Sequence, residues 1–210
     1  MVRQLVYIPI IHTQADMGAL KGPIERVTVQ KLGADGWQRR IQAINQVWER
    51  IEREIAGLAL DYPKVKLYQD GLPLCDQVFD IVKNLAGKGS RNHQLLLKLQ
   101  EKGATIVGSE SPELLLEEYQ RIKHMLDVEN YEQIVQKEEQ QKELGQALLK
   151  KRDRFIAGRI NNTLQIGETG LLFIGMLHSL NGSLADDIEI INLLNFESPN
   201  PDKPEPKKIS

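Results

Sequence analysis

The chain has 210 residues, of which 41% are hydrophobic and 27% are charged, and its formal net charge is −2. This composition is ordinary for a globular protein, and the length is sufficient for one domain with a substantial core. The charge gives no sign of a surface for nucleic acid or an anionic membrane, and the longest apolar stretch, residues 171–177, is far too short to cross a bilayer.

The N-terminal residues 4–12 form an apolar run that predicts a buried first strand. The run superficially resembles a short signal peptide, but it lacks a small-residue cleavage site, and we interpret it as a strand. The following residues 13–36 contain Gly18, Gly22, Pro23, Gly33 and Gly36. Because glycine and proline interrupt regular structure, we expect a long loop here that could close over a site as a lid.

The middle of the chain predicts an alternation of helices and strands. Apolar residues recur with a helical period over residues 37–60, and a second strand at 65–69 ends at Asp70-Gly71. The elements that follow are a helix over 74–85, a helix that Ser90 caps and Gly103 ends, a strand over 104–108, and a helix over 113–125 that begins at Ser111-Pro112.

Residues 129–164 predict a long, highly charged helical region. Its 129–163 part could contact a second copy of the chain or another protein, but its apolar residues are too sparse to favour a coiled coil. Two further strands are predicted at 171–178 and 188–193, and the Pro- and Lys-rich residues 196–210 predict a disordered tail.

Strands that alternate with helices are typical of the α/β class. We therefore predict a single α/β domain over residues 1–195, with a mainly parallel sheet of about five strands flanked by helices. The long charged helical region belongs to the same domain, because nothing in the composition marks a linker.

A seven-residue pattern occurs twice in the chain. Tyr7–Thr13 and Phe173–Ser179 each read as an aromatic residue, Ile, a turn-prone residue, two apolar residues, His and a small hydroxyl residue. His12 and His178 therefore occupy the same place at the end of a predicted strand. Open α/β sheets bind ligands at that edge, so this pair is the strongest indication of function.

Four predicted strands are followed or ended by an ionisable residue, namely His12, Asp70, Glu110 and His178. In a parallel sheet these side chains would converge on one edge, where they could bind a divalent metal ion such as Mn, Co or Zn. They could equally form a metal-free acid–base site. Each residue also has an ordinary structural explanation, in a strand end, a turn or a helix start. Asp16 could orient the imidazole of His12 or only bond within its loop.

The remaining candidates carry weaker signals. Arg152 shares a helix face with Ile156 and could point toward the site as a donor to anions, but the residues alone favour a solvated helix. We expect Cys75 to be a small core residue rather than a nucleophile, and a single cysteine is typical of the reducing cytoplasm. His93 and His124 lie on charged predicted helices, so we expect both at the surface.

Three short motifs between residues 9 and 178 carry a family resemblance. Gly175–His178 reads G-x-x-H, Pro9–His12 reads the same with Pro in place of Gly, and Arg152–Ala157 reads R-D-x-x-I-A. They resemble the superfamily that joins the TIKI and TraB proteins, the erythromycin esterases and the ChaN-like proteins. That family has two G-x-x-H motifs, an acidic residue after an early strand and a helix reading R-[ND]-x-x-M-A. Asp70 stands where the family usually has Glu.

The resemblance implies that Arg152 and Asp153 belong to one site with His12, Asp70 and His178. Members of the family are described as metal-dependent proteases, macrolide-ring esterases, haem-binding proteins and regulators of pheromone signalling, so the fold transfers better than the reaction. We expect a cytoplasmic hydrolase in which water attacks an ester or amide of a small molecule or peptide.

In that hydrolase a histidine or a divalent metal would activate the water, Asp70 would act as base or ligand, and Arg152 would stabilise developing negative charge. The main alternative is a non-catalytic protein that uses the same pocket to bind a metal, haem or an anionic ligand. A third is a regulatory partner protein that uses the charged helix as its contact surface.

Overall fold

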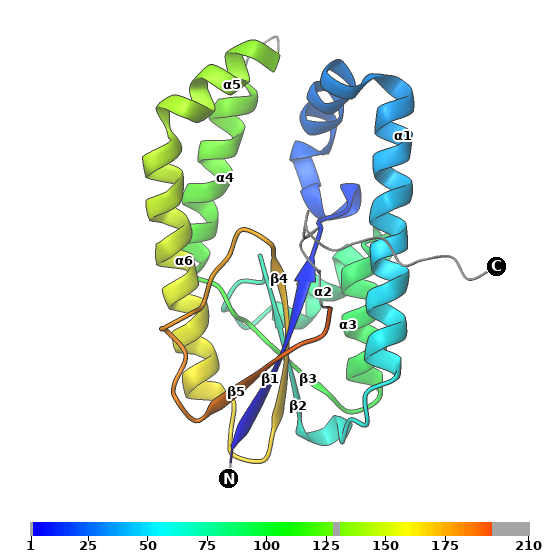
Figure 1. Cartoon of the computed structure of the whole chain (residues 1–210), viewed down its shortest axis with the longest axis vertical. Helices are drawn as coiled ribbons and strands as arrows, with labels where there is room; N and C mark the ends of the chain where they lie inside the picture. The colour runs from blue at the N-terminus through cyan, green and yellow to red at the C-terminus, as the bar shows by residue number, and fades with distance from the viewer. Residues whose placement is uncertain (1, 128–130, 195–210) are drawn as a thin grey trace, which may run out of the picture.

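The computed structural model describes residues 2–127 and 131–194 and shows one five-stranded sheet with helices on both faces (Figure 1). The strands are β1 (Arg3–Ile10), β2 (Val65–Gln69), β3 (Thr105–Val107), β4 (Thr169–Gly175) and β5 (Ile188–Asn192), in the order β3-β2-β4-β1-β5. All paired strands are parallel, which confirms the predicted fold class. Parallel pairing places the carboxyl ends of all five strands along one edge of the sheet.

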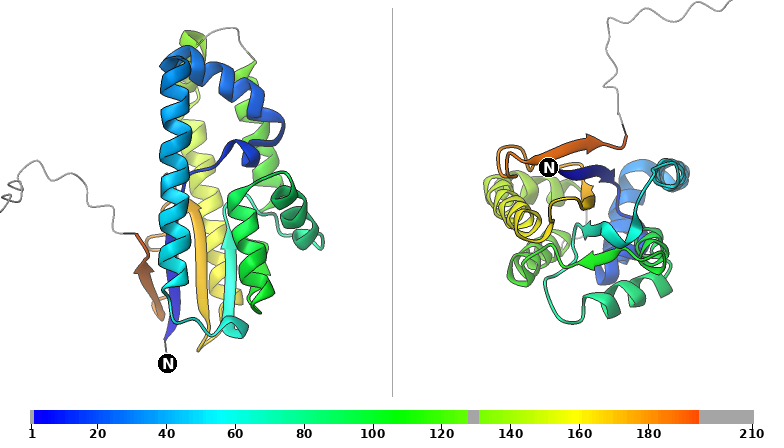
Figure 2. Two further views of the ribbon diagram at one scale, coloured as in Figure 1. Left: turned by 90° about the vertical axis from the view of Figure 1, so that its right-hand side faces the viewer. Right: turned by 90° about the horizontal axis from the view of Figure 1, so that it is seen from below.

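The helices are α1 (Lys21–Ala56), α2 (Val78–Gly87), α3 (Arg91–Glu101), α4 (Pro112–Leu126), α5 (Tyr131–Gln140) and α6 (Lys142–Thr163), with short 3-10 helices η1 (Gln14–Leu20) and η2 (Tyr62–Lys64). Helices α1 and α3 pack on one face of the sheet, and α6 packs on the other (Figure 2). Among the described helices, none has both the length and the apolar character needed to cross a membrane.

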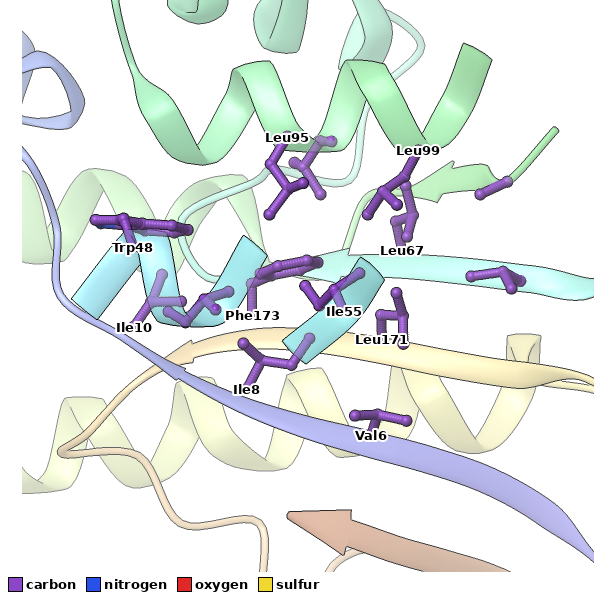
Figure 3. Close-up of a cluster of buried hydrophobic side chains, with 14 of the residues drawn as sticks. Val6, Ile8, Ile10, Trp48, Ile55, Leu67, Leu95, Leu99, Leu171 and Phe173 are labelled. Atoms are coloured by element: carbon purple, nitrogen blue, oxygen red, sulfur yellow. The ribbon is translucent and has the colours of Figure 1, made fainter. Parts of the chain in front are cut away.

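Two hydrophobic cores lie on the two faces of the sheet. The larger one fills the space between the sheet, α1 and α3, and Figure 3 labels Val6, Ile8, Ile10, Trp48, Ile55, Leu67, Leu95, Leu99, Leu171 and Phe173 in it. The smaller one packs Ile156 and Ile160 of α6 against Leu172. Because successive side chains of a strand point to opposite faces, the central strands are apolar on both faces, as expected for buried parallel strands.

The prediction of a long loop over residues 13–36 is wrong, because most of this stretch is helical. It contains η1 and the first part of α1. Pro23 lies in the first turn of α1, where an amide has no intrahelical acceptor in any case. Gly18 (φ 51°) and Gly33 (φ 72°) adopt the left-handed backbone that glycine tolerates. Gly33 therefore joins two helical segments that meet at an angle, at the top of Figure 1.

Other element boundaries differ from the prediction by a few residues. The differences are earlier ends of β1 at Ile10 and of β4 at Gly175, a later start of α2 at Val78, and a break at Gln141 that divides the charged helical region into α5 and α6. Both His12 and His178 therefore lie in the segments that follow their strands. The tail predicted at residues 196–210 lies outside the described residues.

The two copies of the seven-residue pattern lie side by side, because β1 pairs with β4. The register places Ile8, and not Tyr7, opposite Phe173. A shift of one residue sends equivalent side chains to opposite faces of a sheet. The pattern therefore repeats the order of residue types but not the burial of its aromatic residue.

Pro9 occupies an interior strand without disturbing the sheet. Odd-numbered residues of β1 bond to β5 and its flanking residues, as the Arg3 N–Asp187 O bond (3.1 Å) and the Leu193 N–Tyr7 O bond (3.0 Å) show. The next donor toward this side would be the nitrogen of Pro9, which carries no hydrogen. The hydrogen-bonded pairing of β1 with β5 therefore ends before Pro9. Because the nitrogen of Pro9 faces β5 and not β4, the pairing of β1 with β4 loses no hydrogen bond.

Trp48 links α1 to the segment that carries the first histidine. Its side chain is 0% exposed, and its Nε1 donates to the carbonyl of Ile11 (3.0 Å). We expect Trp48→Ala to lower the free energy of unfolding by about 3–5 kcal/mol, because it leaves a cavity in the larger core. Trp48→Phe keeps most of the packing and should cost about 1–2 kcal/mol through the lost hydrogen bond. Urea unfolding measures both losses, and a Trp48→Phe loss below about 0.5 kcal/mol would contradict the contribution of this bond.

Candidate functional site

Arg152 joins two buried carboxylates at the carboxyl edge of the sheet. Its Nε donates to Glu110 Oε2 (2.9 Å), and its Nη2 donates to Glu110 Oε1 (2.5 Å) and Asp70 Oδ1 (2.8 Å). A buried carboxylate is costly unless it is paired and hydrogen-bonded, and this guanidinium pairs with two of them. The structure thus brings together three residues that come from remote parts of the sequence.

Helix α6 presents Arg152 to the sheet. The buried positions of α6 toward its C-terminal end are 152, 153, 156, 157 and 160, which share one helical face. Ile156 and Ile160 of this face belong to the smaller core, so the charged site continues directly from apolar packing. The residues alone had favoured a solvated position for Arg152, and this prediction is wrong because the helix face that carries Arg152 is buried.

Glu110 is held by the loops that follow β2 and β3. Its carbonyl accepts from Leu74 N (2.8 Å), and its carboxylate accepts from Gly71 N (3.0 Å). Ser109 Oγ donates to the carbonyl of Gln69 (2.5 Å), which bonds the two loops to each other. These bonds fix the carboxylate of Glu110 beside the end of β2.

His178 lies between two carboxylates. Its Nδ1 is 2.6 Å from Asp153 Oδ1, and the other oxygen of Asp153 accepts from Ser179 N (3.1 Å). Its Nε2 is 3.4 Å from Asp70 Oδ2. Because a carboxylate accepts only, the short contact places a proton on Nδ1 and fixes the ring. Asp153, which the motif resemblance alone had indicated, thus orients His178.

The spacing of Gly175 and His178 has a structural reason. The amide of His178 donates to the carbonyl of Gly175 (3.1 Å), so residues 175–178 form a turn that brings the imidazole to Asp70. The amide of Gly175 donates to Asp70 Oδ2 (3.0 Å), and a Cβ on Gly175 would lie 2.9 Å from that oxygen. Glycine is required here because the backbone approaches a carboxylate closely.

His12 completes the cluster and connects it with solvent. Its Nε2 is 3.3 Å from Asp70 Oδ2, the same oxygen that His178 approaches. Its side chain is 34% exposed, whereas the side chain of His178 is 4% exposed. Asp70 Oδ2 is therefore the point where both histidines meet, and His12 is the one that an incoming molecule can reach.

The contacts around Asp70 set the protonation of the site. Burial alone would raise the pKa of Asp70, but its bonds with His12 and His178 hold that pKa well below the ordinary value. Burial alone would lower the pKa of each histidine, but the contact with Asp70 raises both above the ordinary value of 6.5. Burial dominates at Glu110 and raises its pKa, although Arg152 opposes this.

Asp16 belongs to a second cluster. Of its two predicted roles, the structure shows hydrogen bonding within its own segment and to Ser90, and not a hydrogen bond to His12. Its carboxylate accepts from Thr13 N (2.6 Å), from Thr13 Oγ1 (2.8 Å) and from the hydroxyl of Ser90. Ser90 Oγ also lies 2.6 Å from His93 Nδ1. Burial would raise the pKa of Asp16, but its bonds with His93, Ser90 and Thr13 lower it to about 2. The cluster fastens η1 to the start of α3.

Two expectations about single residues are wrong. His93 is buried rather than at the surface, because Ser90 and Asp16 hold it at the start of α3. Cys75 is exposed rather than in the core, because it lies in the exposed residues 74–77 just before α2, and none of these belongs to either core. His124 is exposed on α4, as expected.

Part of the cluster could hold a metal ion. Ligand atoms of Asp70, Glu110 and His178 all lie within 4.8 Å of one another, and two carboxylates with an imidazole suit Zn or Mn. His12, the fourth predicted ligand, contacts Asp70 but does not belong to this group. Arg152 already donates to both oxygens of Glu110 and to one of Asp70, so an ion would share its ligands with a permanent positive charge.

A cavity of about 540 Å³ opens beside His12, between α1 and α3. Its volume is typical of pockets that bind small molecules. Trp37, Ile41 and Ile44 of α1 line it, and Ile44 also packs against the larger core. Farther along α1, Trp48, Ile51 and Ile55 lie in that core. The helical period over residues 37–60 predicted a helix here but gave no sign of the cavity. The spacing of Trp37, Ile41 and Ile44 showed an apolar face but not what the face contacts.

The arrangement can exchange protons with a molecule in the cavity. It offers one accessible imidazole, one imidazole fixed between carboxylates, and a guanidinium that holds the central carboxylate in place. No family model, curated protein or solved structure matches the chain.

Gly175 tests whether the site depends on close packing against Asp70. We expect Gly175→Ala to lower the free energy of unfolding by about 1–3 kcal/mol, because the new methyl group pushes Asp70 away from the Gly175 amide. Gly158→Ala on α6 is the matched control, since nothing lies within 4 Å of a Cβ there, and it should stabilise the helix by about 0.5–1 kcal/mol. Urea unfolding compares the two variants, and equal effects would contradict the packing argument.

The histidines give the protein a defined pH dependence. His178 has a raised pKa, so it stabilises the fold fully below pH 6.5, and this contribution is lost as the pH rises through the folded-state pKa. We therefore expect the stability difference between the wild type and His178→Gln to shrink as the pH rises above 6.5. Urea unfolding from about pH 5 to 9 measures this difference, and a constant gap would contradict the contacts with Asp70 and Asp153.

Proposed function

We propose that the chain is a hydrolase that cleaves an ester or amide bond beside His12. The observation that carries the proposal is the contact between buried Asp70 and His12, whose partly exposed ring lines the cavity. A buried carboxylate that orients an accessible imidazole is the arrangement used for general-base catalysis. The resemblance of the two G-x-x-H motifs and the R-D-x-x-I-A helix to the TIKI, TraB, erythromycin esterase and ChaN-like superfamily also supports it.

His12 is the general base in the proposed reaction. When its Nε2 donates to Asp70, its Nδ1 is left as an acceptor that can take a proton from water. The oxygen of that water bonds to the carbonyl carbon of the substrate. His12 then returns the proton to the leaving alcohol or amine as the bond to the carbonyl carbon breaks.

The other charged residues position and balance this pair. Burial alone would lower the pKa of His178, but its contacts with Asp70 and Asp153 raise that pKa and favour the protonated imidazole beside the central carboxylate. Arg152 fixes the second oxygen of Asp70 and both oxygens of Glu110. Because its donors are directed at these carboxylates, we assign Arg152 as a positioning residue rather than as a direct contact of the substrate.

A metal-dependent hydrolase is the second candidate. Asp70, Glu110 and His178 would hold the ion, and their mutual separation favours this version. A bound divalent ion would supply an activated water and a Lewis acid at that place. The pairing of Arg152 with two of the three ligands favours the metal-free version.

Hydrolysis of a small neutral aryl ester, such as p-nitrophenyl acetate, tests the proposal. We expect His12→Gln and Asp70→Asn each to lower kcat/KM by about 10²–10⁴-fold, because they remove the base or the group that orients it. His124→Gln is the matched control, since His124 is exposed on α4, and it should leave the rate unchanged. The product is followed by its absorbance, with unfolding curves recorded for each variant.

The outcomes separate the candidates. Loss of activity on chelation and its return with Mn²⁺ or Zn²⁺ would support the metal-dependent version. Absence of any rate above the uncatalysed reaction, in a folded wild type, would contradict hydrolysis. The double variant His12→Ala/His178→Ala then tests the non-catalytic alternative, in which the variant stays folded and loses only a bound metal, haem or anion.

A further inference from the structure

The cavity beside His12 has two chemically different linings. Its walls come from both segments of α1, from the segment that follows β1, and from α3 with the residue Gly89 before it. His12 is the residue that it shares with the charged cluster, so a molecule in the cavity presents one end to the proposed base. The properties of the remaining lining therefore indicate what kind of molecule reaches that base.

One part of the lining is apolar. Ile24 precedes the kink of α1 at Gly33, and Trp37, Ile41 and Ile44 follow it. Trp37 is itself buried, although it belongs to neither core. This surface can remove an apolar body of several carbon atoms from water.

The other part of the lining is cationic. Lys21, Arg40, Arg91 and Lys98 line the cavity, against Glu52 as the one acid. Arg91 is paired with Glu52, at 2.7 Å from its Nε and 3.2 Å from its Nη2. Within the part of the chain that the structure describes, Lys21, Arg40 and Lys98 take part in no ion pair. A chain of net charge −2 thus concentrates uncompensated positive charge around one pocket.

We infer that the cavity binds an apolar molecule that carries an acid group, and that the substrate belongs to this class. The apolar body lies against Trp37 and Ile41, and a carboxylate or phosphate pairs with Arg40 and Lys98 at the exposed rim. The binding of such a molecule follows from the cavity lining alone. Its being the substrate rests on the proposed hydrolysis at His12.

Binding of inert probes tests the inference without any reaction. Calorimetric titration with decanoate and decyl phosphate is compared with decanol, which lacks the charge, and with acetate and inorganic phosphate, which lack the apolar body. We expect at least one of the two long acids to bind about tenfold or more tightly than decanol, and the short acids not to bind. The stronger of the two long acids identifies the acid group as carboxylate or phosphate.

The neighbouring arginines on α1 provide a matched pair of variants. Arg40 lines the cavity and Arg39 does not, while both are exposed. We expect Arg40→Gln to weaken the long acid about five- to tenfold and Arg39→Gln to leave its affinity unchanged. The fluorescence of Trp37 should change on binding, and this change should be absent from Trp37→Phe, because Trp48 is fully buried in the core.

Three results would overturn the inference: equal affinity for decanol and the long acids, equal effects of the two arginine variants, or binding that leaves Trp37 fluorescence unchanged. These results are independent of the ester assay, which uses a small neutral substrate. Binding of the acids without hydrolysis would refute the proposed reaction and uphold the ligand class. Hydrolysis without binding of the acids would refute the ligand class alone.

Discussion

The buried carboxylate of Asp70 is the constraint on which the rest of the site depends. One oxygen accepts from Arg152, and the other accepts from the amide of Gly175 and contacts both histidines. An ionised carboxylate at this depth is stable only while these partners surround it. The partners come from the N-terminal segment, from β4 and the turn after it, and from α6. The charged cluster therefore ties together parts of the chain that are far apart in sequence, and it contributes to the fold as well as to the proposed chemistry.

The strand order explains how these partners meet. β4 lies between β2 and β1, so the ends of three adjacent strands supply Asp70, the Gly175–His178 turn and His12. The charged cluster extends toward α6 on one face, while the cavity opens between α1 and α3 on the other. His12 lies where the two regions join. A parallel sheet covered by helices on both faces makes this arrangement available at its carboxyl edge.

The sequence predicted the regular elements well because their signals are local. Apolar runs marked the strands, and Ser90 and Ser111 accept the helix-capping bonds that their positions indicated. It failed over residues 13–36, where glycines were interpreted as loop formers although they only bend a helical path. The convergence of His12, Asp70, Glu110 and His178 followed from parallel pairing. The inward direction of Arg152 did not, because a charged helix gives no local signal of which charge is buried. The cavity was missed for a related reason, since an apolar face looks the same in a sequence whether it meets a core or a ligand.

The position of the cavity lining has a consequence for how such a protein can diversify. The residues that line the cavity sit mainly on exposed or half-buried faces of α1 and α3, whereas the charged cluster lies deep at the sheet edge. Exchanges on those helix faces cost little stability, because surface substitutions are usually neutral within about 0.5 kcal/mol. Exchanges in the cluster leave a charge without its counterpart. Selection can therefore alter the lining of the cavity through many tolerated steps, while the residues of the charged cluster stay almost invariant.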